Sequence, residues 1–476
     1  MLATRINTDI VSQIITKEFA MSQRKSQVEH VNQRSAKKDK IRRNSDRQKE
    51  LAKAAICRAE MGSDDESVFN DNASLMSNVS DGSQYKDEFA HNEDATGDDL
   101  TQDEVFEEKL REAMDMATQK SANGRTNALK ALCTGFFKRY LPDFVDDRRV
   151  TLTDIVDKAV KKGKADEKVA AANLAVMICV ELGTSTVAEE VFKDLKPLFT
   201  TQILDNSVSS KARAALASAL GAICFLSSSD LNEFPQVMDT METVFKASYN
   251  NNEPTKHTED ILSLHEAALS SWTLLLTLLP PSKAFKLLES HVTRFGDLLA
   301  STDVDLRIAT GEALVVLYES AVEFNEDEAF SLVEGFLPEL KQLATDSQKF
   351  RSKKDRKEQK SSFRDILKYI EDNDEFYEKI SINSGRETVE LLTWAQKIQY
   401  TSLCKAMGAG MSYHLKENEL IREVFELGEP LPYLLDGSNL KPSKQERNSR
   451  HQQASKWRTQ TRGKNRDKRS QATFSN

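Results

Sequence analysis

Basic side chains gather around an aromatic residue at the end of the chain, a pattern that can bind nucleic acid. Residues 441–476 hold 11 basic and 2 acidic side chains. Lysine and arginine neutralise phosphates and release condensed counterions, while arginine and tryptophan can also stack on exposed bases. We therefore predict an RNA-contacting tail, with a solubilising tail or a nuclear localisation signal as the alternative. The candidate residues are Arg447, Arg450, Lys456, Trp457, Arg458, Arg462, Lys464, Arg466, Lys468 and Arg469.

A second basic cluster lies just before Phe363, in a segment that we expect to be a loop. Residues 351–360 include six basic and two acidic side chains. Because this loop would belong to a folded module, we expect it to form a fixed edge that contacts phosphates. The alternative is an exposed helix start without a partner. The candidate residues are Arg351, Lys353, Lys354, Arg356, Lys357 and Lys360.

Residue patterns that support catalysis or metal binding are missing. The seven histidines are scattered, and the sequence has no HExxH motif, no paired-cysteine spacing, no GxxxxGK phosphate loop and no GxSxG motif. Gly408 and Gly410 lack the third glycine and the preceding strand of a dinucleotide site. His265 and His291 lie in helical patterns, where buried, hydrogen-bonded imidazoles are expected rather than ligands. We predict a protein that is not an enzyme, with no catalytic residue, cofactor, metal or small-molecule substrate.

Charge is segregated along the chain, although the net charge is only −9. Residues 1–59 hold 14 basic and 6 acidic side chains, whereas residues 60–108 hold 16 acidic and 1 basic. Blocks of like charge do not pack, so we expect both ends of the chain to be disordered.

The cysteines and the apolar runs indicate the cellular compartment in which the protein is found. Cys133, Cys179 and Cys224 each sit in an apolar helical pattern, and none of the five cysteines forms a CxxC pair. Such a set is typical of reduced core cysteines in a cytosolic or nuclear protein. Neither a secretory signal nor a membrane span is visible. We therefore expect a soluble protein of the cytoplasm and nucleus, with no membrane partner.

A repeated helical pattern occupies the middle of the chain. Alanine- and leucine-rich helices start at Arg125, Lys168, Arg213, His265 and Arg307, at spacings of 43, 45, 52 and 42 residues. This period matches HEAT or armadillo repeats, in which stacked helix pairs leave a concave face for protein partners. An irregular helical bundle is the alternative. The long spacing is explained by a polar surface loop at 249–258. The partner helices are expected at 150–160, 188–199, 235–247, 284–299 and 327–343.

Two further helices are predicted after the basic cluster. An apolar face that runs from Leu391 to Ile398 indicates the first, which Gly408 and Gly410 would end. The second would bury residues from Leu415 to Phe425 and stop at Gly428. Trp394 and Tyr400 are interpreted as core and rim packing rather than base-stacking groups, because their neighbours on the helix are aliphatic. No strand-like alternation of useful length is visible.

The block 351–428 resembles the C-terminal module of the interferon-related developmental regulator family. The resemblance is carried by the basic segment followed by FRDIL, by LLTWAQKIQY, by the GAG break and by HLKENELIREVFELG. A weaker resemblance extends back to about Gln102. The resemblance to this family implies a non-enzymatic helical-repeat regulator. Such regulators are associated with ribosome binding and translational silencing, and with transcriptional co-repressor assemblies.

The fold class expected is all-α, an armadillo/HEAT-like helical-repeat solenoid with a C-terminal helical module and disordered charged termini. The expected partners are the ribosome and its rRNA, with translation silenced by steric occupation, and protein partners on the concave helical surface. The alternative function is a nuclear scaffold that bridges transcription factors and a deacetylase-type co-repressor. The expected parts are a basic arm at 1–60, an acidic linker at 61–101, repeats at 102–345, the family-type module at 346–436 and a basic tail at 437–476.

Overall fold

The computed structural model describes residues 102–183, 185–228, 230, 232–249, 257–345 and 353–431. The predicted basic arm, acidic linker and basic tail lie outside these residues, as does most of the predicted loop at 249–258. The described residues belong to one compact unit.

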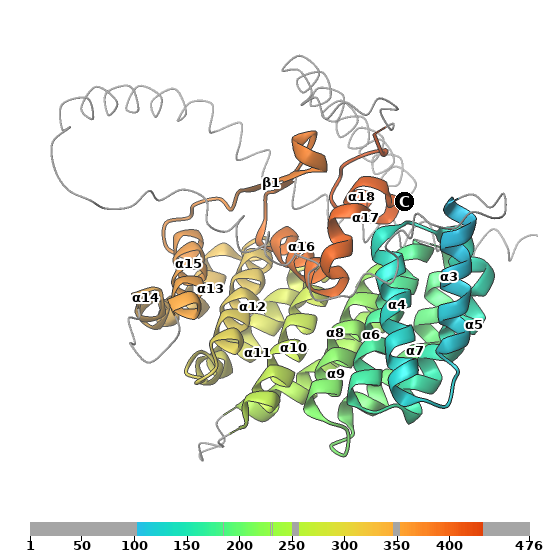
Figure 1. Ribbon diagram of the computed structural model, residues 1–476. Helices are drawn as coiled ribbons and strands as arrows, with labels where there is room; N and C mark the ends of the chain where they lie inside the picture. Colours follow the sequence, from blue (N-terminus) through green and yellow to red (C-terminus); the bar gives the residue numbers. More distant parts are fainter. Residues whose placement is uncertain are drawn as a thin grey trace, which may run out of the picture. The chain divides into compact units, whose positions relative to one another are not determined.

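Two rows of helices build the repeat region, as the sequence predicts (Figure 1). Each alanine-rich helix packs on the next to form one row, here called the inner row, and the partner helices form the outer row. Helix α3 (Gln102–Met116) precedes both rows. The inner row consists of α4 (Ala122–Lys138), α6 (Ala165–Leu182), α8 (Ser210–Ser227), α10 (Glu259–Leu276) and α12 (Val304–Val322). The outer row consists of α5 (Pro142–Lys162), α7 (Thr186–Leu204), α9 (Glu233–Phe245) with the 3-10 turn η1 (Lys246–Ser248), and α11 (Pro281–Leu299).

Local sequence signals start these helices. Ser185, Ser209 and Asp303 precede α7, α8 and α12, and each side chain accepts a hydrogen bond from a backbone N–H of the first turn. Such caps satisfy donors that have no partner within the helix. Pro142 and Pro281 open α5 and α11, where the missing N–H costs nothing.

The core lies between the rows, and the inner helices are buried on most sides. Cys179 of α6 and Cys224 of α8 are both fully buried, which confirms the predicted register of these two repeats and their core cysteines. Gly221 shows how closely the inner helices approach, because a Cβ added there would lie 2.6 Å from the Cβ of Ser271 on α10. A small residue is therefore required at this crossing. The fold is the all-α helical-repeat solenoid that the sequence predicts.

The last outer helix differs from its prediction. The segment expected as one helix at 327–343 is divided into α13 (Glu326–Val333), the 3-10 turn η2 (Glu334–Phe336) and α14 (Leu337–Thr345). Pro338 explains the division, because proline has no N–H to donate and its ring clashes with the carbonyl four residues earlier.

The basic segment before Phe363 is a helix and not the predicted loop. Helix α15 runs from Lys353 to Ile370 and packs against α12 and α14. Gln359, Phe363, Ile366 and Ile370 form its buried face. The 3.6-residue period of these buried positions extends into the basic segment, so burial keeps the basic residues helical.

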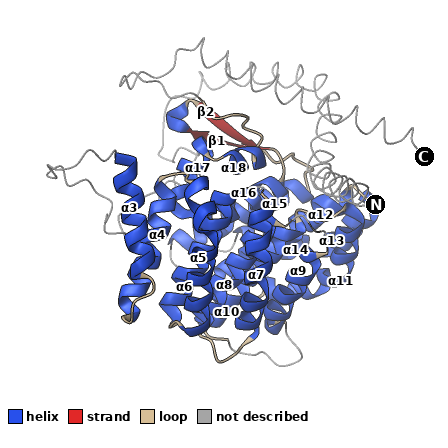
Figure 2. Cartoon of the chain, turned by 90° about the vertical axis from the view of Figure 1, so that its right-hand side faces the viewer, coloured by secondary structure: helices blue, strands red, loops and turns tan. Residues whose placement is uncertain are grey.

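A β-hairpin follows, although no strand was predicted. Strand β1 (Glu378–Ile382) pairs antiparallel with β2 (Glu387–Leu391) around the 3-10 turn η3 (Asn383–Gly385). Figure 2 shows it as the small sheet beside the C-terminal helices. Leu391 therefore ends a strand, and the predicted helix begins later as α16 (Trp394–Met407). Thr393 sets this start, because its hydroxyl accepts a hydrogen bond from the N–H of Gln396.

The final helices lie along the inner row. Gly408, with φ 51°, ends α16 as predicted. The predicted second helix is divided at Asn418, whose side chain caps the new start by accepting from the N–H of Ile421. The parts are the 3-10 turn η4 (Gly408–Gly410), α17 (Met411–Glu417) and α18 (Glu419–Val424).

This C-terminal path covers part of the inner row. Helix α16 contacts α6, α8, α10 and α12, while η4 and α17 contact α4. The inner-row face is therefore occupied by the chain's own helices along this path. Within the described ranges, no helix is both long and apolar enough to cross a membrane.

Candidate functional site

The predicted RNA-binding residues fall into two groups. Arg351 and all ten tail residues lie outside the described residues. Lys353 and Lys354 belong to the first turn of α15. Lys357 is exposed, and Arg356 and Lys360 are half-buried on the same helix.

A buried hydrogen-bond network fixes the basic end of α15 to the repeats. Arg307 of α12 is only 2% exposed, and its Nε and Nη2 donate to Oε1 of Gln359 at 3.1 and 2.5 Å. Arg307 also donates to the carbonyl oxygen of Ser301, and Nε2 of Gln359 donates to that of Leu343. A buried guanidinium needs such partners, so the network holds α15 in one position relative to α12 and α14.

Close packing holds the middle of α15. A Cβ added to Gly311 of α12 would lie 2.8 Å from the Phe363 ring and 2.9 Å from Cδ1 of Ile366. Phe363 and Ile366 are fully buried. The absence of a side chain at Gly311 thus lets α15 rest directly on α12.

The helical conformation joins four basic residues into one stripe. At about 100° per residue, Lys357, Lys360, Arg364 and Lys368 fall within about 80° of the helix circumference. Lys357, Arg364 and Lys368 are exposed, and Lys360 is half-buried. We call these four residues the α15 stripe. Arg364 and Lys368 were missed because the predicted loop ended at Lys360. Extending the helical period of Phe363, Ile366 and Ile370 backward to Lys357 would have placed all four residues on one face.

A buried carboxylate anchors the start of α16. The two carboxylate oxygens of Glu319 on α12 accept from the N–H groups of Trp394 and Ala395, each at 2.9 Å. Burial raises the pKa of Glu319 to about 7, against the opposing effect of these hydrogen bonds. Negative charge at a helix N-terminus is favourable. Farther along α16, Nε2 of Gln399 donates to the Thr277 hydroxyl at 2.9 Å.

A buried histidine joins α17 to the first repeats. His414 is fully buried, and its Nε2 lies 2.8 Å from the carbonyl oxygen of Phe136 on α4. Its Nδ1 lies 3.2 Å from Nδ2 of Asn418, which also donates to the carbonyl oxygen of Val180 on α6 at 2.9 Å. These contacts require a neutral ring with its proton on Nε2. Burial lowers the pKa of His414 to about 4. Oε1 of Glu181 lies 3.8 Å from Nε2 of His414.

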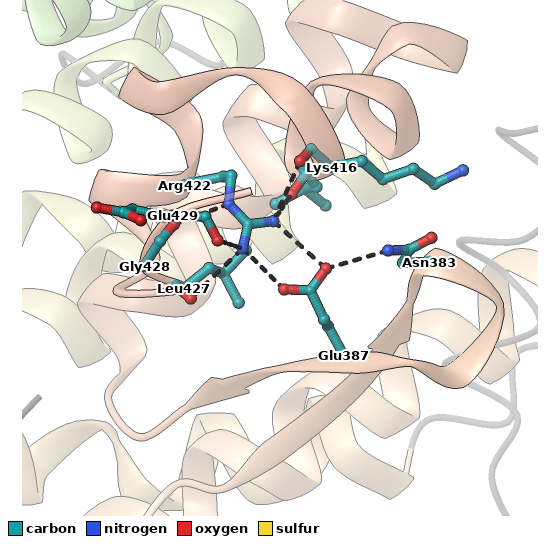
Figure 3. Close-up of polar contacts among 8 residues, drawn as sticks. Asn383, Glu387, Lys416, Arg422, Leu427, Gly428 and Glu429 are labelled. Atoms are coloured by element: carbon teal, nitrogen blue, oxygen red, sulfur yellow. Dashed lines mark hydrogen bonds and ion pairs between the residues drawn. The ribbon is translucent and has the colours of Figure 1, made fainter. Parts of the chain in front are cut away.

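An arginine clamp holds the chain immediately before the tail. Arg422 of α18 is 1% exposed, and its guanidinium pairs with Glu387 of β2 at 2.7 Å (Figure 3). Nε donates to the carbonyl oxygen of Gly428 at 2.8 Å and Nη2 to that of Glu429 at 2.9 Å. Nη1 donates to the carbonyl oxygen of Leu415 at 2.8 Å. The planar fork of arginine suits these diverging acceptors, so one side chain joins the hairpin, α17, α18 and the segment that leads into the tail.

The aromatic and histidine residues singled out in the sequence belong to the core. Trp394 is fully buried and Tyr400 is 7% exposed, so both are packing residues as predicted. His265 and His291 are buried, and each ring makes a hydrogen bond, to Ser248 and Tyr249 respectively. In the part of the chain that the structure describes, no group of three or more His, Cys, Asp or Glu residues could hold a metal ion.

Comparisons with known families match two parts of the chain. Residues 72–371 match the family model described as interferon-related developmental regulator. Residues 418–470 match a second model, described as interferon-related protein conserved region. The hairpin and α16 lie between the two matched ranges.

Curated relatives extend over most of the chain. Interferon-related developmental regulator 1 of Sus scrofa is 37% identical over 408 residues, covering 84% of this chain and 90% of the relative. The human protein of that name is also 37% identical, with the same coverage. Interferon-related developmental regulator 2 of Mus musculus is 38% identical, covering 78% of this chain and 85% of the relative. An engineered protein of solved structure is similar with a TM-score of 0.35 and 14% identity, covering 54% of this chain and 97% of its own.

Proposed function

Because this chain belongs to the interferon-related developmental regulator family, we propose that it is a regulator that works by binding and not by catalysis. Its target in this proposal is the ribosome, contacted through rRNA. The helical scaffold supplies a rigid platform, and the basic segments reach the polyanionic partner. The family membership confirms the resemblance read from the C-terminal block.

The observation that carries the proposal is the clamp around Arg422. It immobilises the chain at Gly428 and Glu429, shortly before the basic residues that begin at Lys441. A basic segment anchored at a fixed point loses less freedom on binding than one attached to a mobile support. The α15 stripe is held on the same compact unit by the Arg307–Gln359 network. The α15 stripe and the segment that leads into the basic tail are thus both held by hydrogen bonds of buried side chains in the folded unit.

In this proposal, translation is silenced because the tail occupies space on the ribosome that tRNA or mRNA needs. A basic tail that binds in a functional channel of the ribosome would exclude tRNA or mRNA without making or breaking a covalent bond. Phosphate contacts also make such binding sensitive to salt. The proposed activity is therefore translational repression by steric exclusion.

Sedimentation of cell extracts tests the proposal. We expect the full chain to sediment with 80S ribosomes at low salt and to dissociate as salt rises, and a chain lacking residues 441–476 to lose most of this association. The loss should not reflect unfolding, because the deletion begins beyond the clamp. Sedimentation of the full chain only at the top of the gradient at low salt would contradict the proposal.

The nuclear co-repressor scaffold is less well supported. That function requires a protein-binding face, and the sequence suggested the concave face of the repeats for it, without assigning that face to the inner row. Helices α16 and α17 lie along this row from α12 to α4. Nuclear enrichment together with absence from ribosome fractions would nevertheless favour the scaffold.

A further inference from the structure

We propose that the α15 stripe binds the phosphate backbone of double-helical RNA. This inference rests on the proposed function and deepens it, because it assigns a kind of RNA to one surface of the scaffold. The surface is formed by Lys357, Lys360, Arg364 and Lys368. It is distinct from the tail, whose tryptophan suits exposed bases.

The stripe is a straight row of cations. Its members are three or four residues apart, which places successive side chains about 5–6 Å from one another along the helix surface. From Lys357 to Lys368 the row extends about 16 Å at 1.5 Å per residue. Phosphates also follow one another at regular intervals along a strand, so several can be neutralised at once.

The acidic residues of α15 do not interrupt the stripe. Asp355, Glu358 and Asp365 project at least about 60° away from it around the helix. Glu371 follows the helix in line with the stripe, but its carboxylate is paired with Lys341 of α14 at 2.6 Å. Between Lys357 and Lys368 the stripe positions themselves are all basic, while the exposed Asp372, Asp374 and Glu375 follow the end of the helix. A local row of like charge attracts a polyanion and raises its rate of association.

The packing of α15 argues against a membrane or an apolar protein partner. A helix that lies in a membrane surface inserts its apolar face, whereas Phe363, Ile366 and Ile370 are already buried in this protein. Protein interfaces concentrate aromatic and apolar residues and are depleted of lysine. Three of the four stripe residues are lysines.

The kind of RNA is inferred from α15 itself, whose described aromatic residues offer no exposed ring beside the stripe. Single-stranded RNA is bound through bases that stack on aromatic side chains, whereas a double helix is contacted through its backbone and shape. The described aromatic residues of α15 are unavailable for stacking on bases. Phe363 is buried, and Tyr369 packs edge-on against Tyr318 and Trp394.

The test replaces the stripe in the full chain. The variant K357Q/K360Q/R364Q/K368Q removes four charges from exposed or half-buried positions. The matched control K158Q/K161Q/K162Q/K193Q removes four exposed charges from α5 and α7. Binding to a fluorescent RNA duplex and to a single strand of equal length is measured at several salt concentrations. Melting temperatures verify that both variants are folded.

For the duplex, we expect the stripe variant to bind at least about tenfold more weakly at low salt. Its slope of log affinity against log salt should be shallower by about 3.6, since each of the four phosphate contacts contributes about 0.9. The single strand should be affected much less, and the control should behave as the unmodified chain.

Unchanged duplex binding by the stripe variant would overturn the inference, and so would any of three further results. They are equal losses for duplex and single strand, equal losses for the stripe variant and the control, and unchanged duplex binding with loss of binding to an acidic peptide of residues 60–100. The last result would assign the stripe to the chain's own acidic segment. If the stripe variant still sediments with ribosomes but binds duplex RNA normally, this inference fails and the proposed function stands.

Discussion

At the scale of single residues, His414 makes the docking of α17 sensitive to acid. Its ring must stay neutral to accept from Asn418, and burial lowers its pKa to about 4 from an ordinary value near 6.5. A histidine with a depressed pKa takes up protons more readily in the unfolded chain. Its stabilising contribution is therefore complete above pH 6.5 and is lost as the pH falls toward 4.

We expect His414→Gln to reduce the loss of stability between pH 6.5 and pH 4 by up to about 3 kcal/mol, at the cost of lower stability at pH 7. Chemical denaturation at several pH values measures this. His257→Gln serves as the control, because His257 is more exposed and lies outside the His414 cluster. An acid profile that is identical for the unmodified chain and His414→Gln would contradict the assignment.

Arg422 is the second critical residue, because its buried charge depends on several acceptors at once. Arg422→Lys keeps the charge but cannot reach Glu387 and the carbonyl oxygens of Leu415, Gly428 and Glu429 together. We expect a loss of about 3–5 kcal/mol in the free energy of unfolding, which denaturant titration would measure. Arg364→Lys, on the exposed face of α15, should change stability by less than about 0.5 kcal/mol. Equal effects of the two substitutions would show that the clamp is not structural.

At the scale of elements, the contact between α12 and α15 depends on the absence of a side chain at Gly311. Gly311→Val would force atoms against the Phe363 ring and Ile366. We expect a loss of about 1–3 kcal/mol from overpacking, together with weaker duplex RNA binding, because α15 carries the stripe. Gly335→Val is the control, since a Cβ at Gly335 has no atom within 4 Å.

Melting curves and RNA titrations check this prediction together. A Gly311→Val chain that melts and binds as the unmodified chain does would mean that α15 can shift without consequence. Loss of stability with unchanged duplex binding would separate the packing of α15 from its proposed role.

At the scale of the whole molecule, the C-terminal helices connect repeats that are far apart in sequence. Helix α16 contacts four inner helices, and α17 contacts α4. Simple repeat stacks have contacts only between neighbours, so their stability is nearly a sum over repeats. The added path of α16 and α17 should make the described unit unfold more cooperatively.

Two truncations test this expectation. We expect a chain that ends at residue 440 to melt at the temperature of the full chain. A chain that ends at residue 390 loses α16, α17 and α18 and exposes the inner row, so it should melt at a lower temperature over a broader range. Calorimetry measures both. An unchanged transition after the second truncation would show that the repeats are stable without the C-terminal helices.

Much of the architecture could be predicted from the sequence because it depends on local signals. The repeat period, the partner helices and the register of Cys179 and Cys224 follow from the spacing of apolar and small residues. Gly408 ends its helix as the sequence indicated. The burial of Trp394 and Tyr400 was also visible in the aliphatic neighbours that they have on one helical face.

The predictions failed where distant residues determine the local structure. Residues 353–360 are helical because Gln359 and Phe363 pack on α12, and the hairpin places Glu387 where it pairs with Arg422, 35 residues later. The stripe, the clamp and the covered inner row include contacts between residues up to 278 positions apart. The sequence by itself determined the family, the helical repeats and the basic character of the candidate surfaces. Only the tertiary structure decided that residues 353–360 are helical and which surface the chain covers, because local periodicity carries no information about such distant contacts.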